Sequence, residues 1–132
     1  MACRALTACT STASSGSADA APAKAPTANE SKAIADAEAA AGISPKPDAT
    51  TQAKYIQALT RIDAEIVNGK PDKAVSRGRI QCSMIHNFPK GKAKQVHSAE
   101  LRFISPNHPG GFGKAKAAQI VEAVHTYLCP KF

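Results

Sequence analysis

The apolar side chains in the second half of the chain recur every three to four residues, as they do on one face of a helix. In the segment 51–68 these positions are Tyr55, Ile56, Leu59, Ile62 and Ile66. Thr50 or Thr51 can cap the start of this segment, and Asn68-Gly69 is a typical helix end. The pattern therefore predicts a first amphipathic helix over 51–68.

Three further amphipathic helices follow in the sequence. The second covers 71–86, with one face made of Ala74, Val75, Gly78, Cys82 and Ile85. The third covers 90–103, and its apolar residues are Ala93, Val96, Leu101 and Phe103. The fourth covers 114–128, with a stripe of Ala117, Ile120, Val121, Val124 and Leu128. The connections are short and no strand-like alternation occurs, so the pattern predicts a small all-α, four-helix domain over 50–132.

The first part of the chain has a different composition. Residues 10–49 are mostly Ala, Ser, Thr, Pro and Lys, and Ile34 and Ile43 are their only large aliphatic side chains. Such a stretch buries too little apolar surface to offset the cost of ordering it. We expect it to be a disordered, flexible tether, in which the Ala-rich residues 31–41 favour a short helix.

Positive charge is concentrated in the same half of the chain as the predicted helices. From 70 to 132, eleven Lys and Arg residues outnumber three acidic residues, which gives this part a net charge of +8. The whole chain has a net charge of +7, so the rest contributes −1. Such a surface suits an anionic partner: a lipid head group, a wall polymer, an acidic protein or a nucleic acid. The alternative is a solvated surface without a partner. The candidate anion-binding residues are Lys73, Arg77, Arg79, Lys114 and Lys116.

Residues 6–9 read Leu-Thr-Ala-Cys, which resembles the bacterial lipobox. The resemblance implies that Cys9 is lipidated and becomes the first mature residue, and the polar stretch after it suits a tether. Only eight residues precede Cys9, fewer than a signal peptide needs. We therefore expect Met1 to lie inside a longer signal peptide, of which residues 1–9 are the remnant, and Cys3 to be removed with it. The alternative is a chance match at a soluble N-terminus.

If Cys3 is removed and Cys9 carries lipid, two cysteines remain, Cys82 and Cys129. A pair in an exported domain favours a disulfide. A metal site is an alternative, although neither cysteine has a second one at zinc-ligand spacing. A catalytic Cys82 paired with His86 at i+4 is another, and it requires a free thiol.

Other chemistry-bearing patterns are weak. The four histidines include no i, i+4 pair of the metal-binding type. The loop 104–113 is rich in Gly and Pro and leads into a helix N-terminus, which can bind an anion, but it lacks the phosphate-loop pattern and suits a plain connector. Asp72, Glu100 and Glu122 lie on separate helices and form no acid–base pair. We therefore expect no enzymatic activity, no cofactor and no metal.

Two cysteine contexts resemble those of a protein family. They are Lys73-Ala-Val-Ser-Arg-Gly-Arg-x-x-Cys82 and Ala118-x-Ile-Val-x-Ala-Val-x-x-Tyr-Leu-Cys-Pro130. Both are similar to segments of small secreted or lipid-anchored actinobacterial proteins, which resemble the family catalogued as domain of unknown function seven-three-two. The resemblance covers roughly residues 52–130. It implies a short, helical, exported protein with the Cys82–Cys129 bond, and it supplies no catalytic residues.

These observations together lead to one expected function and one alternative. The chain is expected to be a non-enzymatic envelope lipoprotein, either lipid-anchored on the extracellular face of the cell membrane or secreted. Its basic helical domain is expected to bind an anionic lipid, wall polymer or protein. The alternative is a small intracellular nucleic-acid-binding protein, against which stand the cysteine pair and the low aromatic content of 5%.

Overall fold

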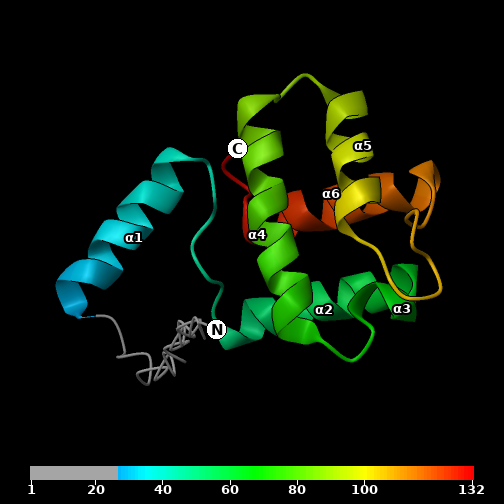
Figure 1. Ribbon diagram of the computed structural model, residues 1–132, viewed down its shortest axis with the longest axis horizontal. Coiled ribbons are helices and arrows are strands. Elements are labelled where there is room, and N and C mark those ends of the chain that lie inside the picture. Colours follow the sequence, from blue (N-terminus) through cyan, green and yellow to red (C-terminus); the bar gives the residue numbers. More distant parts are fainter. Residues whose placement is uncertain (1–26) are drawn as a thin grey trace, which may run out of the picture.

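Six helices lie within residues 27–132, the part of the chain that the computed structural model describes (Figure 1). They are α1 (Ala28–Ala40), α2 (Ala49–Ile62), α3 (Ala64–Val67), α4 (Pro71–Asn87), α5 (Lys92–Arg102) and α6 (Lys114–Leu128). The expected all-α fold is confirmed, and the β pairing found in this range is an isolated bridge between Ser105 and His108. The expected signal-peptide remnant 1–9, with the candidate lipidation site Cys9, and residues 10–26 of the expected tether lie outside the described residues.

The helix expected over 51–68 is divided into α2 and α3 at Asp63. This residue has extended backbone dihedrals, and its N–H still donates to Leu59 O at the end of α2. Its side chain accepts from Glu65 N, so it caps the start of α3. A carboxylate that binds a free backbone N–H stabilises a new helix start. The apolar stripe continues across the break because Ile66 is buried with Leu59 in the same core.

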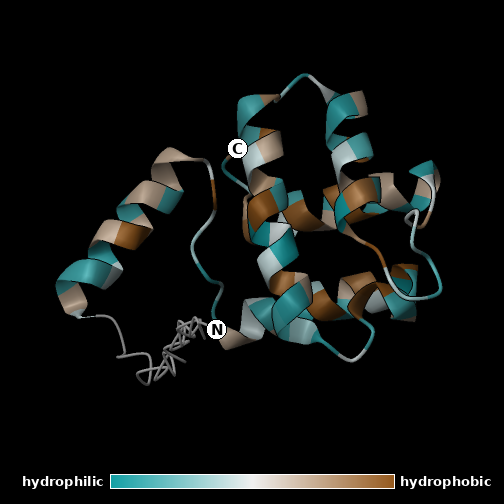
Figure 2. Ribbon diagram, in the orientation of Figure 1, coloured by the Kyte–Doolittle hydropathy of each residue, from teal (hydrophilic) through white to brown (hydrophobic). Residues whose placement is uncertain are grey.

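Helix α6 is the centre of the domain. It packs against α2, α4 and α5, while α4 also packs against α2, α3 and α5. Hydrophobic residues gather where α4 and α6 face one another, and polar residues cover the outer sides of the helices (Figure 2). The largest fully buried side chains are Tyr55, Phe103, Leu59, Ile66, Ile120, Gln81, Val124 and Cys82.

Only part of the apolar stripe expected for α5 faces the core: Phe103 is fully buried and Val96 packs against the core. Ala93 and Leu101 are exposed, Leu101 by 64%, whereas Gln95 and Ala99 are buried. Gln95 Nε2 donates to Phe88 O at 2.7 Å, and its backbone O accepts from Gln81 Nε2 at 2.8 Å. Polar contacts to α4 therefore fix the rotation of α5 and leave Leu101 on the outside.

The predicted disulfide between Cys82 and Cys129 is confirmed. It joins the middle of α4 to the residue that ends α6, with a Cα–Cα distance of 6.0 Å. Both cysteines are buried, and Cys82 has no exposed surface. A bond across 47 positions removes chain entropy from the unfolded state, which the loop-closure relation puts at about 4 kcal/mol.

Helix α1 stands away from the other helices, and none of its residues is buried (Figure 1). Its start is a capping box formed by Thr27 and Glu30. The chain after it returns to α4, where Gly42 and Ser44 are buried. Arg79 of α4 donates to Ser44 O at 2.7 Å and forms an ion pair with Glu38. The end of the N-terminal segment is therefore bound to α4.

Helix α4 packs tightly against α2 and α6 at Gly78. A Cβ added there would overlap the Tyr55 hydroxyl and lie 2.5 Å from Leu128 Cδ1. The Tyr55 side chain has little room to move away, because it is fully buried and its hydroxyl donates to Ala74 O at 3.2 Å. Burial also raises the pKa of Tyr55, so the phenol stays neutral.

We predict that Gly78→Ala lowers the free energy of unfolding by about 1–3 kcal/mol, because overpacking outweighs the gain in helix propensity. The measurement is urea unfolding with the disulfide intact. Gly110→Ala is the control, since a Cβ at Gly110 meets nothing within 4 Å. Equal stability of the two variants would contradict the close crossing.

Candidate anion-binding pocket

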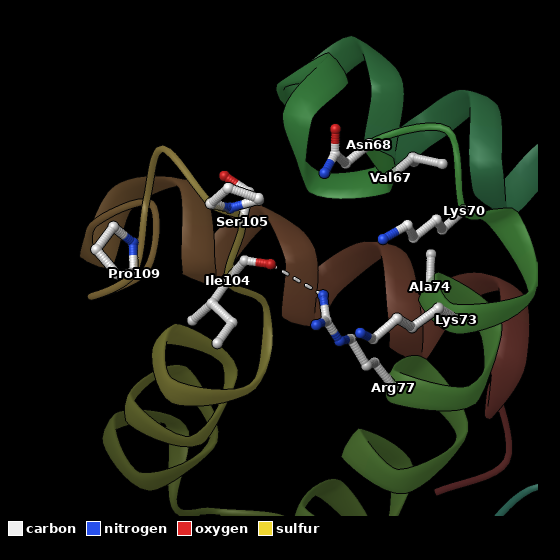
Figure 3. A pocket seen from close by; sticks show the side chains of 10 residues that line it. Val67, Asn68, Lys70, Lys73, Ala74, Arg77, Ile104, Ser105 and Pro109 are labelled. Carbon is white, nitrogen blue, oxygen red and sulfur yellow. Dashed lines mark hydrogen bonds between the residues drawn. The ribbon is translucent and has the colours of Figure 1, made fainter.

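A pocket of about 280 Å³ opens between α3, the first two turns of α4 and the loop after α5. The basic side chains of α4 project toward this loop across the pocket (Figure 3). The lining residues are Val67, Asn68, Lys70, Lys73, Ala74, Arg77, Ile104, Ser105, Pro106 and Pro109. No carboxylate is among them, so the charge of the wall is entirely positive.

Three cations line the pocket from one side. Lys70 precedes α4, and Lys73 and Arg77 follow on one side of the helix at i+3 and i+7, a spacing that keeps side chains on a common face. None of the three forms an ion pair among residues 27–132. The start of α4 adds partial positive charge, and it has no side-chain cap. An anionic group in the pocket would therefore meet cations that have no carboxylate to compete for them.

Arg77 bridges the two walls of the pocket. Its Nη1 donates to Ile104 O in the opposite loop at 3.0 Å (Figure 3). A guanidinium carries five N–H donors, so one bond to the loop leaves others for a ligand. This contact orients the planar group before any ligand arrives, which lowers the entropy lost on binding.

The structure brings together two of the five residues expected to bind an anion. Lys73 and Arg77 line the pocket, whereas Arg79 holds the N-terminal segment through Glu38 and Ser44. Lys116 Nζ donates to Asp63 Oδ2 at 2.7 Å and so ties α6 to the α2–α3 break.

The remaining expected residue, Lys114, is exposed at the start of α6 and lines a separate pocket beside α5. Lys70 belongs to the basic half of the sequence but was not among the residues expected to bind an anion. Its spacing of three and seven residues from Lys73 and Arg77 is the signal that could have found it.

A polar cluster on Glu65 holds the loop that forms the far wall. Glu65 Oε1 accepts from Asn107 Nδ2 at 3.0 Å, and its Oε2 accepts from Ser105 Oγ at 3.2 Å. His108 Nδ1 lies 2.9 Å from the same Oε2 and 3.3 Å from Ser105 Oγ. Phe112 stacks on the His108 ring with 4.4 Å between ring centres. Sequence reasoning missed this cluster because its members lie about forty residues apart.

The cluster contains Ser, His and Glu but does not have the geometry of a hydrolase triad. In a triad the serine and the acid contact different ring nitrogens, so that the histidine can pass a proton between them. Here Ser105 and Glu65 both approach His108 Nδ1. Ser105 is also 7% exposed, which hinders substrate access. The arrangement fastens the loop and provides no activated nucleophile.

Other expected or alternative chemistry finds little support among the described residues. Cys82 is in the disulfide, so the Cys82–His86 hypothesis has no free thiol in this structure. No group of three or more His, Cys, Asp or Glu residues within 27–132 is placed to hold a metal ion. No helix in that range is both long and apolar enough to cross a bilayer.

Comparison with family models, with curated proteins and with solved structures finds no match for this chain. The resemblance to the family of unknown function therefore rests on the two cysteine contexts alone.

The Glu65 cluster makes the loop sensitive to acid. Hydrogen bonds, first that of Asn107 and then those of His108 and Ser105, lower the pKa of Glu65 below its ordinary 4.5. A carboxylate whose pKa is lowered on folding stabilises the fold above its unfolded pKa, and the contribution disappears as the pH falls through the folded value. The loop is thus expected to loosen below pH 4.5.

We predict that backbone hydrogen exchange in residues 104–113, corrected for intrinsic rates, rises as the pH is lowered below 4.5. Glu65→Gln should show the loosened loop at neutral pH and lose the pH dependence, because the amide carries no charge to titrate. Exchange at the C-terminal end of α6 is the internal control. Unchanged loop exchange in Glu65→Gln would show that the cluster does not hold the wall.

Proposed function

We propose that this protein is a non-enzymatic, exported lipoprotein whose helical domain binds an anionic partner outside the cell membrane. The observation that carries the proposal is the pocket walled by Lys70, Lys73 and Arg77, in which no acidic residue takes part. Its volume of about 280 Å³ suits a phosphate or carboxylate group of a larger molecule better than a whole cofactor.

Two features support an exported, anchored protein. Cys9 lies in a lipobox-like Leu-Thr-Ala-Cys sequence, followed by a polar stretch long enough to act as a tether. The buried Cys82–Cys129 bond suits an oxidising compartment, where disulfides persist. In this proposal a lipid on Cys9 holds the chain at the membrane, and the domain binds anions near that surface.

We predict that Lys73→Gln combined with Arg77→Gln weakens binding of a short inorganic polyphosphate by about tenfold or more, since hydrogen bonds to charged groups contribute about 1.5–3 kcal/mol each. The dependence of binding on salt should fall as well, because two counterion-releasing contacts are lost. Isothermal titration calorimetry at several salt concentrations measures both.

The matched control removes the same charge elsewhere. Lys54 and Arg61 are exposed on α2 and line other parts of the surface. The Lys54→Gln, Arg61→Gln variant should bind polyphosphate nearly as well as the parent protein. Equal losses in the two double variants would show that net charge alone drives binding, and the pocket proposal would then fail.

We predict that the protein expressed with its own upstream region, and extracted from membranes, has an intact mass that begins at a lipid-modified Cys9. Cys82 and Cys129 should react with an alkylating agent only after reduction, because both are buried and bonded. Cys9→Ser should carry no lipid mass. A mass beginning at Met1 with four reactive thiols would contradict the lipid-anchored location outside the membrane and favour the intracellular nucleic-acid-binding alternative.

A further inference from the structure

The outer face of the α4–α5 pair combines exposed apolar side chains with positive charge. A second, open pocket of about 420 Å³ lies on it, between the end of α4 and the middle of α5. Its lining consists of Met84, Phe88, Lys94, His97, Ser98, Leu101 and Arg102. As in the first pocket, every residue in this lining that can carry a charge is basic or a histidine.

The two pockets belong to one face. Along α4, positions 73, 77, 84 and 88 recur at spacings of four, seven and four residues, which places them on one side of the helix. The first two line the basic pocket and the last two line the apolar one. The contact from Arg77 to Ile104 O connects the end of α5 to the same face. Asp72 and Glu100, the acidic residues of α4 and α5, line neither pocket.

Large hydrophobic side chains protrude from this face. Leu101 is 64% exposed, and Phe88 and Ile104 are each 38% exposed. Ile80, one turn before Met84, is also exposed. Four of the six large hydrophobic side chains that are exposed within 27–132 therefore lie on α4, α5 or the loops that follow them. Lys94 lies over the Phe88 ring, with 4.5 Å from Nζ to the ring centre, so charge and apolar surface are adjacent.

We propose that this face, called here the α4–α5 face and defined by Lys73, Arg77, Phe88, Lys94 and Leu101, lies flat on the surface of an anionic lipid bilayer. The proposal rests on the proposed function, because it identifies the anionic partner of the basic pocket as a lipid head group. The cations take up phosphate groups, while Phe88 and Leu101 enter the boundary between head groups and acyl chains.

The protruding side chains decide between a bilayer and a peptide partner. An acidic helix that docks into a groove needs a recessed apolar floor. In this open pocket Leu101 is 64% exposed, and the lining includes two polar side chains: Ser98 Oγ and Arg102 Nη1 donate to Gln81 Oε1 at 3.2 and 3.1 Å. An exposed apolar side chain with cations beside it suits a bilayer, which has anionic head groups at its surface and acyl chains below them.

The sequence contains no tryptophan, so a single introduced one reports on a chosen position. The probe protein is the full chain with Cys3→Ser and Cys9→Ser, which prevents lipid attachment from causing binding. Leu101→Trp places the reporter on the α4–α5 face, and Ile34→Trp on exposed α1 is the matched control. Vesicles are made of phosphatidylcholine with or without phosphatidylglycerol, and some contain brominated acyl chains as quenchers.

The expected result is that the fluorescence of the Leu101→Trp variant shifts to the blue and is quenched by brominated lipid only when phosphatidylglycerol is present. The control at position 34 should do neither. In the absence of the reporter, Phe88→Ser with Leu101→Ser should weaken sedimentation with anionic vesicles about tenfold or more. Each of Lys73→Gln and Arg77→Gln should weaken it about fivefold.

The outcomes separate this inference from the proposed function. Binding to anionic vesicles without a blue shift, or with an unaffected serine variant, would leave a purely electrostatic contact and overturn insertion of this face. Binding to polyphosphate without vesicle binding would overturn the lipid partner and keep the proposed function. A blue shift that depends on protein concentration and not on vesicles would make the face an interface between two copies. If the parent protein bound neither polyphosphate nor anionic vesicles, both proposals would be overturned.

Discussion

Helix α4 is held against α6 by the bond between Cys82 and Cys129, and against α2 by a crossing in which only glycine fits at position 78. The side of the helix opposite these contacts carries Lys73 and Arg77. One helix thus supplies a part of the core and two of the three basic residues of the pocket wall. The position of the cations relative to the loop depends on how firmly the core holds α4.

The disulfide matters because the domain is small. About eighty residues form the domain, and a domain of this size has a net stability of roughly 5–15 kcal/mol or less. A cross-link that contributes about 4 kcal/mol across 47 positions is then a large part of the whole. The bond lies in the part of α4 between the two pockets, so it keeps in place the helix that both pockets share.

Much of the fold could be predicted from periodicity, because α4 and α6 follow one uninterrupted apolar stripe each. The break at Asp63 could not, since the stripe continues through it and only the capping contact to Glu65 N divides the helix. The rotation of α5 could not be predicted either. It depends on the buried polar residue Gln95, and an apolar pattern takes no account of polar residues. Charge alone found two of the three basic residues that line the pocket, Lys73 and Arg77. The Glu65 cluster joins distant segments and needed coordinates.

The polar contacts that turn α5 also create the exposed apolar surface. Gln81 is fully buried, and it joins Gln95, Ser98 and Arg102 through hydrogen bonds from both ends of its amide. A buried amide with one missing partner costs about 1–3 kcal/mol, so α5 cannot rotate Leu101 inward without breaking this network. The same rotation places Ala99 and Phe103 of this segment in the core. The network therefore fixes Leu101 on the outside, where contact with an apolar partner would bury it.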